Sequence, residues 1–382
     1  MALTTTDGSK TLFTYAPETT AGTSPVAVYK TLRSKTGVKF DLKRDTFASK
    51  ERRADRMEGP MTYGNKSGSG SIPVEWSYGS YDDFLEAVLG GTWTSDVLKI
   101  GNTQRTFSFE ETAAIGITEQ KLGVQFTGLS INQKVNTIAD GDFSFLFRNI
   151  HGPQTLGVNL AIDATAKTIT RASAGFITVD GWEVGAAVLG LGNTDAGNNN
   201  TTPWVITSLT DTVMTFTTMV GAVTKTTTAG ITLNQGSIAS SVTAAATTTP
   251  FNSFTGTITE GGAVLAHVTG WDLKVDQAAQ ENHANGSDVA QSVSIGTIKV
   301  SGNLSVYYIN QALRKKFLNG TSSVLQLVLG SVAATKAYAL DMGTITYTGN
   351  SRDDGELVIT ESMPFSATYT AVDGTLKVTR TP

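Results

Sequence analysis

One pattern of alternating residues occurs twice in this chain of 382 residues, once in each half. Near residue 38 the sequence is GVKFDLKRD, and near residue 270 it is GWDLKVDQ. In both segments apolar side chains alternate with charged ones, which is the pattern of a β-strand with one apolar and one polar face. Self-similarity of this kind indicates repeated structural units, and it limits the folds that the chain can adopt.

The same order of elements follows each of these strands. A long polar loop comes first, over residues 44–66 in the first half and 277–292 in the second. Each loop leads into a second alternating strand, GSGSIPVEWSY or KVSGNLSVYY, and then into a short helix. Ser80 and Asn310 are the predicted N-caps of the two helices, because their side chains can accept hydrogen bonds from first-turn N–H groups.

Both halves are predicted to end with further strands. Residues 126–131 and 142–147 are expected to match residues 344–348 and 356–359, in that order. The ordered match indicates a tandem duplication. Two unrelated β domains with similar patterns are the alternative.

A segment of different composition separates the two halves. Residues 152–258 are rich in Thr, Ala, Gly and Asn and contain few charges, which predicts a small β domain inserted at a loop. Its predicted strands are residues 168–171, 204–209 and 213–217, and its predicted aromatic core is Phe176, Trp182 and Trp204. The predicted domains are residues 1–151 for the first repeat with an N-terminal arm, 152–258 for the inserted outer domain, and 259–382 for the second repeat.

The sequence contains no pattern that is typical of catalysis. With zero cysteines it excludes disulfides, thiolate metal sites and cysteine nucleophiles. The three histidines, His151, His267 and His283, lack metal-ligand spacing, and no glycine-rich phosphate loop occurs. We therefore predict that the protein is not an enzyme and has no catalytic, cofactor-binding or metal-binding residues.

Charge and hydropathy exclude two further classes. The formal net charge of −4 argues against a dedicated nucleic-acid binder, which normally has a surplus of basic residues. No apolar run reaches the ~18 residues that a membrane helix needs, and the first ten residues lack the apolar stretch of a signal peptide. We expect a protein that is made in the cytoplasm and does not bind a membrane.

The two long loops have opposite charge. Residues 41–57 contain six basic and four acidic side chains, whereas residues 272–288 contain four acidic side chains and one lysine. Solvated loops are one interpretation. The other is a self-stacking assembly, because complementary charge fixes the register between copies.

The run SKERRADRMEGPMTYGNKSGSGSIPVEWSYGSYDDFLEAVLGGTW resembles the major tail tube proteins of long-tailed, siphovirus-type bacteriophages. The resemblance covers residues 25–150 and, more weakly, 265–372. It implies a mainly β fold of two tandem tail-tube-type β-sandwich domains, each with a short helix, whose strands join an oligomeric β-barrel. It also implies a structural subunit of the phage tail tube, which self-assembles into stacked rings and forms the conduit for genome ejection.

The resemblance further implies the partners and the place of assembly. The expected partners are other copies of the chain, the tape measure protein, the tail terminator and tail tip proteins, and passing DNA that is not bound sequence-specifically. The expected location is the virion tail, after assembly in the host cytoplasm. A β-rich virion surface protein, such as a tail-tip adhesin or carbohydrate-binding module, is the alternative, with Trp182 and Trp204 available to stack on sugars.

Two sets of residues are candidates for these functions. The expected ring-stacking residues are Arg44, Lys50, Glu51, Arg52, Arg53, Asp55, Arg56, Tyr63, Asp276, Glu281 and Asp288. The expected lumen-facing residues are Lys39, Asp41, Glu75, Ser77, Asp272, Lys274, Ser305 and Tyr307. If each repeat supplies about four strands to a barrel of about 24, three chains close a ring with pseudo-sixfold symmetry. A hexamer with a decorating C-terminal domain is the alternative.

Overall fold

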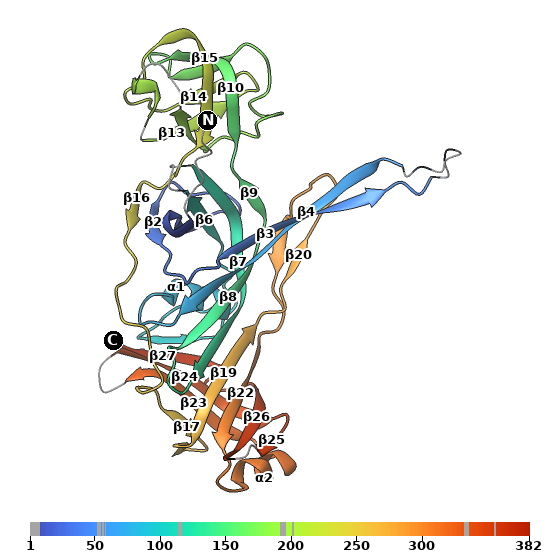
Figure 1. Ribbon diagram of the computed structural model, residues 1–382, viewed down its shortest axis with the longest axis vertical. Coiled ribbons are helices and arrows are strands. Elements are labelled where there is room, and N and C mark those ends of the chain that lie inside the picture. The colour runs from blue at the N-terminus through green and yellow to red at the C-terminus, as the bar shows by residue number, and fades with distance from the viewer. Residues whose placement is uncertain are drawn as a thin grey trace. The chain divides into compact units, whose positions relative to one another are not determined.

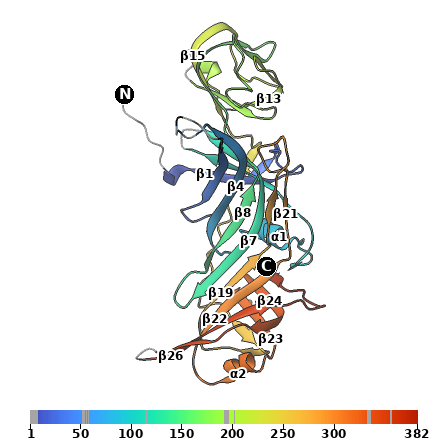
Figure 2. The same cartoon turned by 90° about the vertical axis from the view of Figure 1, so that its right-hand side faces the viewer.

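The computed structural model describes residues 8–51, 55, 57, 59–113, 117–191, 196–200, 202–331, 336–354 and 357–382. The chain is mainly β and forms two compact units (Figures 1 and 2). Unit 1 consists of Met1–Leu32, Thr106–Val124 and Arg148–Ala244, and unit 2 consists of Arg33–Arg105, Gln125–Phe147 and Ala245–Pro382.

Unit 2 contains both copies of the repeated pattern. The elements of its first repeat are β3 (Lys39–Ala48), β4 (Met61–Glu75), α1 (Asp82–Leu89), β5 (Val97–Lys99), the second half of β7 (Thr118–Lys134) and β8 (Asp140–Phe147). The elements of its second repeat are β17 (Ile258–Glu260), β18 (Ala263–Val264), β19 (Val268–Asp276), β20 (Gln280–Asn282), β21 (Ser292–Ser294), β22 (Lys299–Tyr307), α2 (Ala312–Leu318), β23 (Ser323–Ser331), β24 (Lys336–Tyr347), β25 (Ser351–Asp354), β26 (Ile359–Ala367) and β27 (Lys377–Thr381).

The strands of both repeats form one continuous antiparallel sheet. Its order is β3, β4, β8, β7, β19, β22 and β26. Beyond β26, the eighth position is shared by the end of β24 and by β25, which pair with different parts of β26. The repeats join where β7 pairs with β19, in a register that runs from Gly128 opposite Asp276 to Lys134 opposite Gly270.

The duplication is visible in the register of the sheet. In the first repeat Gly70 of β4 lies between Phe40 of β3 and Phe145 of β8. In the second repeat Gly302 of β22 lies between Leu273 of β19 and Phe365 of β26. A Cβ atom on either glycine would collide with a neighbouring backbone carbonyl and with the Phe ring, so both copies need glycine at this place. Thus β3, β4 and β8 correspond to β19, β22 and β26.

The two short helices form where the sequence predicts them, but neither predicted residue occupies the N-cap position. Tyr81 occupies the N-cap of α1, and the Ser80 hydroxyl is 2.7 Å from that of Ser77 instead. Gln311 occupies the N-cap of α2, and the side chain of Asn310, one residue earlier, accepts a hydrogen bond from the Ala312 N–H at 2.8 Å. Gly90, with φ of +64°, ends α1 in the left-handed conformation that glycine tolerates.

The apolar face of the first repeat packs on α1. Phe84 of this helix has its ring centre 4.5 Å from that of Phe126 in β7 and 5.4 Å from that of Phe143 in β8. Ile72 and Val74 of β4 are fully buried on the same face. Alternation in the sequence thus becomes one buried and one polar side of the sheet, as the pattern predicts.

Two further expectations differ from the structure. The strand that matches residues 142–147 is β26, not residues 356–359, because Phe145 and Phe365 hold equivalent places beside Gly70 and Gly302. Much of the expected loop over residues 44–66 is strand, because β3 and β4 continue as a hairpin to the pair Ala48 and Met61.

Unit 1 combines open strand pairs with a closed barrel. Its strand pairs use β1 (Leu12–Pro17), β2 (Val28–Thr31), β6 (Phe107–Thr112), the first half of β7, β9 (Asn149–His151) and β16 (Ser241–Thr243). The barrel consists of β10 (Gln154–Asp163), β11 (Thr168–Arg171), β12 (Ala187–Leu191), β13 (Trp204–Leu209), β14 (Val213–Phe216) and β15 (Lys225–Gln235). Phe176, Trp182 and Trp204 are at most 2% exposed in its core, which confirms their predicted role.

Candidate assembly and lumen surfaces

The hairpin of β3 and β4 extends beyond the rest of its sheet as a two-stranded arm (Figure 1). β8 pairs with β4 only from Gly68 onward, so residues 44–48 and 61–66 pair with each other alone within the described sheet. Phe47, Met61 and Tyr63 are each more than 60% exposed on this arm. An isolated two-stranded ribbon is marginally stable, and grouped exposed apolar side chains mark contact sites. The arm is therefore a candidate surface for contact with another molecule.

The base of the arm is held by the acidic loop of the second repeat. The Lys66 ammonium donates to Asp288 Oδ2 at 2.8 Å, and Arg44 Nη2 is 3.6 Å from the same oxygen. The hydrogen bond from Lys66 lowers the pKa of the Asp288 carboxyl. Glu281 Oε1 accepts a hydrogen bond from the Gly68 N–H at 3.2 Å. The structure thus brings together Arg44, Glu281 and Asp288 inside one chain.

The other expected stacking residues occupy different places. Lys50, Glu51 and Asp55 are exposed near the tip of the arm. Arg52, Arg53 and Arg56 lie outside the described residues. Tyr63 is on the arm, with its ring centre 4.7 Å from the Arg44 guanidinium. Asp276 is not on the arm but at the end of β19, where it shares a strand face with Asp272 and Lys274.

Most of the expected lumen residues share the polar face of the sheet. Lys39, Asp41, Lys274 and Tyr307 are exposed there, and Glu75, Asp272 and Ser305 are half-buried. The exception is Ser77, which is fully buried beyond the end of β4, next to Pro250. Partial burial raises the pKa of the Asp272 carboxyl above its usual range.

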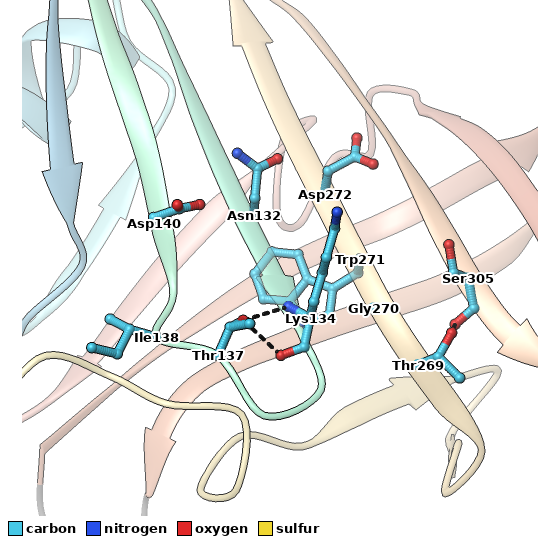
Figure 3. A pocket seen from close by; sticks show the side chains of 10 residues that line it. All are labelled: Asn132, Lys134, Thr137, Ile138, Asp140, Thr269, Gly270, Trp271, Asp272 and Ser305. Atoms are coloured by element: carbon cyan, nitrogen blue, oxygen red, sulfur yellow. Dashed lines mark hydrogen bonds between the residues drawn. The ribbon is translucent and has the colours of Figure 1, made fainter.

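A groove with both polar and apolar lining residues crosses this face where the two repeats meet (Figure 3). It has a volume of about 450 Å³ and includes Asn132 and Lys134 of β7, Asp140 of β8, Asp272 of β19 and Ser305 of β22. Figure 3 shows the polar ends of Asn132, Lys134 and Asp272 projecting from neighbouring strands. The expected lumen residues Asp272 and Ser305 are thus brought together in one groove.

Sequence reasoning missed Lys66, which makes the shortest ion pair at the base of the arm. Its partner Asp288 lies in the other repeat, so the pair becomes visible only in the folded chain, where the two loops meet. Sequence reasoning also missed β25 as the continuation of β24. The turn residue Gly349 between these two strands was the available signal, because glycine inside a strand pattern marks a bend.

Three observations concern sugar binding, metal binding and membrane insertion. Trp182 and Trp204 are buried in the barrel, so they cannot stack on a sugar. Among the described side chains, no three histidine, aspartate or glutamate residues are close enough to hold a metal ion. No described helix has the length and apolarity to cross a membrane.

Comparison with known proteins gives the family. The model of the family described as phage tail tube protein matches twice, over residues 8–238 and 212–367, so it covers most of the chain. The first match also runs through the barrel. No curated relative matches the chain. The two matches agree with the tandem sheet repeats and assign a structural, not an enzymatic, role. The chain belongs to the phage tail tube protein family.

Proposed function

We propose that this protein forms the wall of a phage tail tube by joining its sheet to those of other copies in stacked rings. The observation that supports this most strongly is the continuous antiparallel sheet of both repeats, which ends on each side at a strand with one described neighbour. Open edges of this kind are normally covered, and closing a barrel removes them. Each chain contributes eight neighbouring strand positions to the wall, so three chains give about 24 strands and a ring with pseudo-sixfold symmetry.

The polar face of the sheet is the proposed lining of the bore. Acidic side chains outnumber basic ones among its described residues. The acidic ones are Asp41, Glu75, Asp140, Asp142, Asp272, Asp276 and Asp353, and the basic ones are Lys39, Lys43, Lys134, Lys274 and Lys299. A mildly negative bore lets DNA pass, because it makes few of the phosphate contacts that hold DNA in place. The lining supports a conduit for genome ejection without sequence-specific binding.

The arm is the proposed contact with the neighbouring ring. Its exposed Phe47 and Tyr63, together with Lys50 and Glu51 near the tip, form a mixed apolar and charged surface. Because Asp288 and Glu281 already bind the base of the arm in their own chain, we assign them to fixing the direction of the arm. At the ends of the tube the same surfaces would meet the tail terminator and tail tip proteins, and the bore would hold the tape measure protein.

The barrel of unit 1 is the proposed outer decoration, and residues 1–151, 152–258 and 259–382 are the proposed domains. A six-stranded barrel with its own buried core is too large for a bore lined by side chains. Assembly is expected in the host cytoplasm, before the tail joins the virion.

Electron microscopy of the purified full-length chain tests this function. We expect hollow tubes or discs, and three chains per disc in averaged end-on views. Six chains per disc would support the hexamer with a decorating C-terminal domain. A chain that remains a compact monomer at the highest soluble concentration would overturn the proposal.

A further inference from the structure

We propose that neighbouring chains in the ring pair β3 with β25 in one fixed register, with Lys39 of one copy directly opposite Asp353 of the next. This inference rests on the proposed tube function and names the contact that closes the ring. The junction of β7 and β19 inside each chain is the template. In that junction Asn132 lies opposite Asp272, and Ser130 lies opposite Lys274.

The strand β3 matches β19, but on the side where β19 pairs with β7, β3 pairs with no strand that the structure describes. Gly70 and Gly302 fix the correspondence, so Lys39, Asp41 and Leu42 match Asp272, Lys274 and Val275. Val275 is fully buried, whereas Leu42 is 44% exposed. The difference in exposure follows because β19 lies between β22 and β7, while β3 has only β4 beside it in the described sheet. The face of β3 is therefore incomplete in the single chain.

The strand β25 is the counterpart of the second half of β7. Phe126 of β7 pairs with Phe145, and Tyr347 of β24 pairs with the equivalent Phe365. Counting six residues onward from each, Asn132 corresponds to Asp353. Asn132 pairs with Asp140 on β8, and Asp353 pairs with Thr360, the equivalent position on β26. The side of β25 away from β26 therefore matches the side of β7 that binds β19.

We apply the register of the β7–β19 junction to β25 of one copy and β3 of the next. Asp353 then lies opposite Lys39, and Ser351 lies opposite Asp41. Lys39 and Asp353 are both exposed in the single chain. Oppositely charged residues that face each other across antiparallel strands stabilise the pairing. Charge complementarity and continuity with the internal junction both favour a second copy of this chain as the partner.

The charge reversal between the repeats distinguishes the edge strand β3 from its internal equivalent β19. Lys39, Asp41 and Lys43 of β3 correspond to Asp272, Lys274 and Asp276 of β19, so the sign changes at each position. An aspartate at the place of Lys39, as in β19, would put two like charges opposite each other at Asp353, which destabilises strand pairing. The strand β19 itself already has β22 and β7 on its two sides. First and second repeats therefore alternate around the ring.

A pair of engineered cysteines tests the register, because the natural chain has none. We expect the full-length double variant Lys39→Cys/Asp353→Cys to assemble when reduced and, after mild oxidation of the tubes, to give covalent oligomers that end at three chains. The matched control Asp41→Cys/Asp353→Cys shifts one cysteine by two residues, which exceeds the reach of a disulfide between directly paired strands. It should crosslink at least tenfold less. Equal or stronger crosslinking in the control would overturn the register.

Charge-reversal variants test the same contact without a crosslink. Lys39→Glu should raise the concentration needed for assembly by roughly fivefold or more, since a favourable cross-strand pair becomes unfavourable. Lys39→Glu/Asp353→Lys should restore assembly. The matched control Lys43→Glu should change assembly less than twofold, because Lys43 would face Gly349. Failure of the double exchange to restore assembly would contradict the pairing.

The outcomes separate this inference from the proposed function. Tubes of the natural chain together with no Lys39–Asp353 crosslink and no charge rescue would leave the tube function intact and overturn this interface. Absence of rings or tubes from the natural chain would overturn the proposed function, and this interface with it.

Discussion

Asp82 and Arg380, which come from opposite repeats, form an ion pair in which Arg380 Nη1 donates to Asp82 Oδ2 at 2.7 Å. Arg380 Nε also donates to Asp96 at 2.6 Å, and the guanidinium lies 4.7 Å from the centre of the Trp93 ring. Tyr338 of β24 donates to the other oxygen of Asp82. The last strand of the chain thus fastens the helix of the first repeat to the second repeat.

Removing this guanidinium should destabilise unit 2. Arg380→Ala removes one donor from each of two partly buried carboxylates, and we expect the free energy of unfolding to fall by about 2 kcal/mol. Urea unfolding of unassembled protein, followed by tryptophan fluorescence, measures the change. Lys315→Ala, on the exposed side of α2, is the control and should have little effect. Equal stability of the two variants would contradict the role of Arg380.

The equivalent glycines should be equally intolerant of a side chain. Gly70→Ala places a methyl group against the Lys39 carbonyl, and Gly302→Ala places one against the Asp272 carbonyl. Each variant should lose about 2 kcal/mol or more of stability, because the strands must separate to make room. Thermal melts measure this loss. Gly8→Ala, where no atom lies within 4 Å of the added carbon, is the control. A tolerated alanine at only one of the two glycines would argue against their equivalence.

Acid should release the loop that holds the base of the arm. The pKa of Asp288 is lower in the folded chain than in the unfolded one, because Lys66 stabilises the carboxylate. The stabilisation is therefore complete above the unfolded value, near pH 4, and is lost as the pH falls through the depressed folded value. The backbone N–H of Lys66 donates to the Asp288 carbonyl at 2.6 Å. Its hydrogen exchange, corrected for the pH dependence of the intrinsic rate, should accelerate as the pH falls through the pKa of Asp288. Asp288→Asn should show faster exchange already at pH 7.

The ionised carboxyl of Asp272 should destabilise the folded chain, in contrast to that of Asp288. Partial burial raises its pKa, so the folded chain binds this proton more readily than the unfolded chain, and stability decreases as the pH rises through that range. Asp272→Asn is expected to raise the urea midpoint at pH 7 and to have no such effect at pH 3, where the natural carboxyl is protonated. A lower midpoint at pH 7 would show that the carboxylate is stabilising.

The barrel should be removable without loss of tubes. Gln154 and Asn234 are direct partners in β10 and β15, so the chain enters and leaves the barrel at neighbouring points. Replacing residues 154–235 with a short Gly-Ser linker should leave tube formation intact and produce thinner tubes by electron microscopy. Loss of all tubes, with the remaining sheet still folded by circular dichroism, would contradict an outer location for the barrel.

The sequence alone determined the alternating strands of both repeats, three of the six barrel strands and the absence of catalytic motifs. Alternation of period two is a local property, so it identified the buried faces around Ile72, Leu304 and Trp271, and the strands at residues 168–171 and 204–209. Local rules were less reliable at the ends of elements: Ser80 does not cap α1, and the loop of residues 44–66 is largely hairpin, because tertiary contacts decide where a strand stops.

Only the tertiary structure decided which strands are neighbours and which edges remain open. The pairing of β7 with β19, the ion pairs of Asp288 and Arg380, and the match of Lys39 with Asp272 join residues far apart in the chain. A strand's pattern records which face is buried but not which strand lies beside it, because backbone hydrogen bonds between strands depend little on side-chain identity. Register, and with it the open edges, follows from how the whole sheet packs.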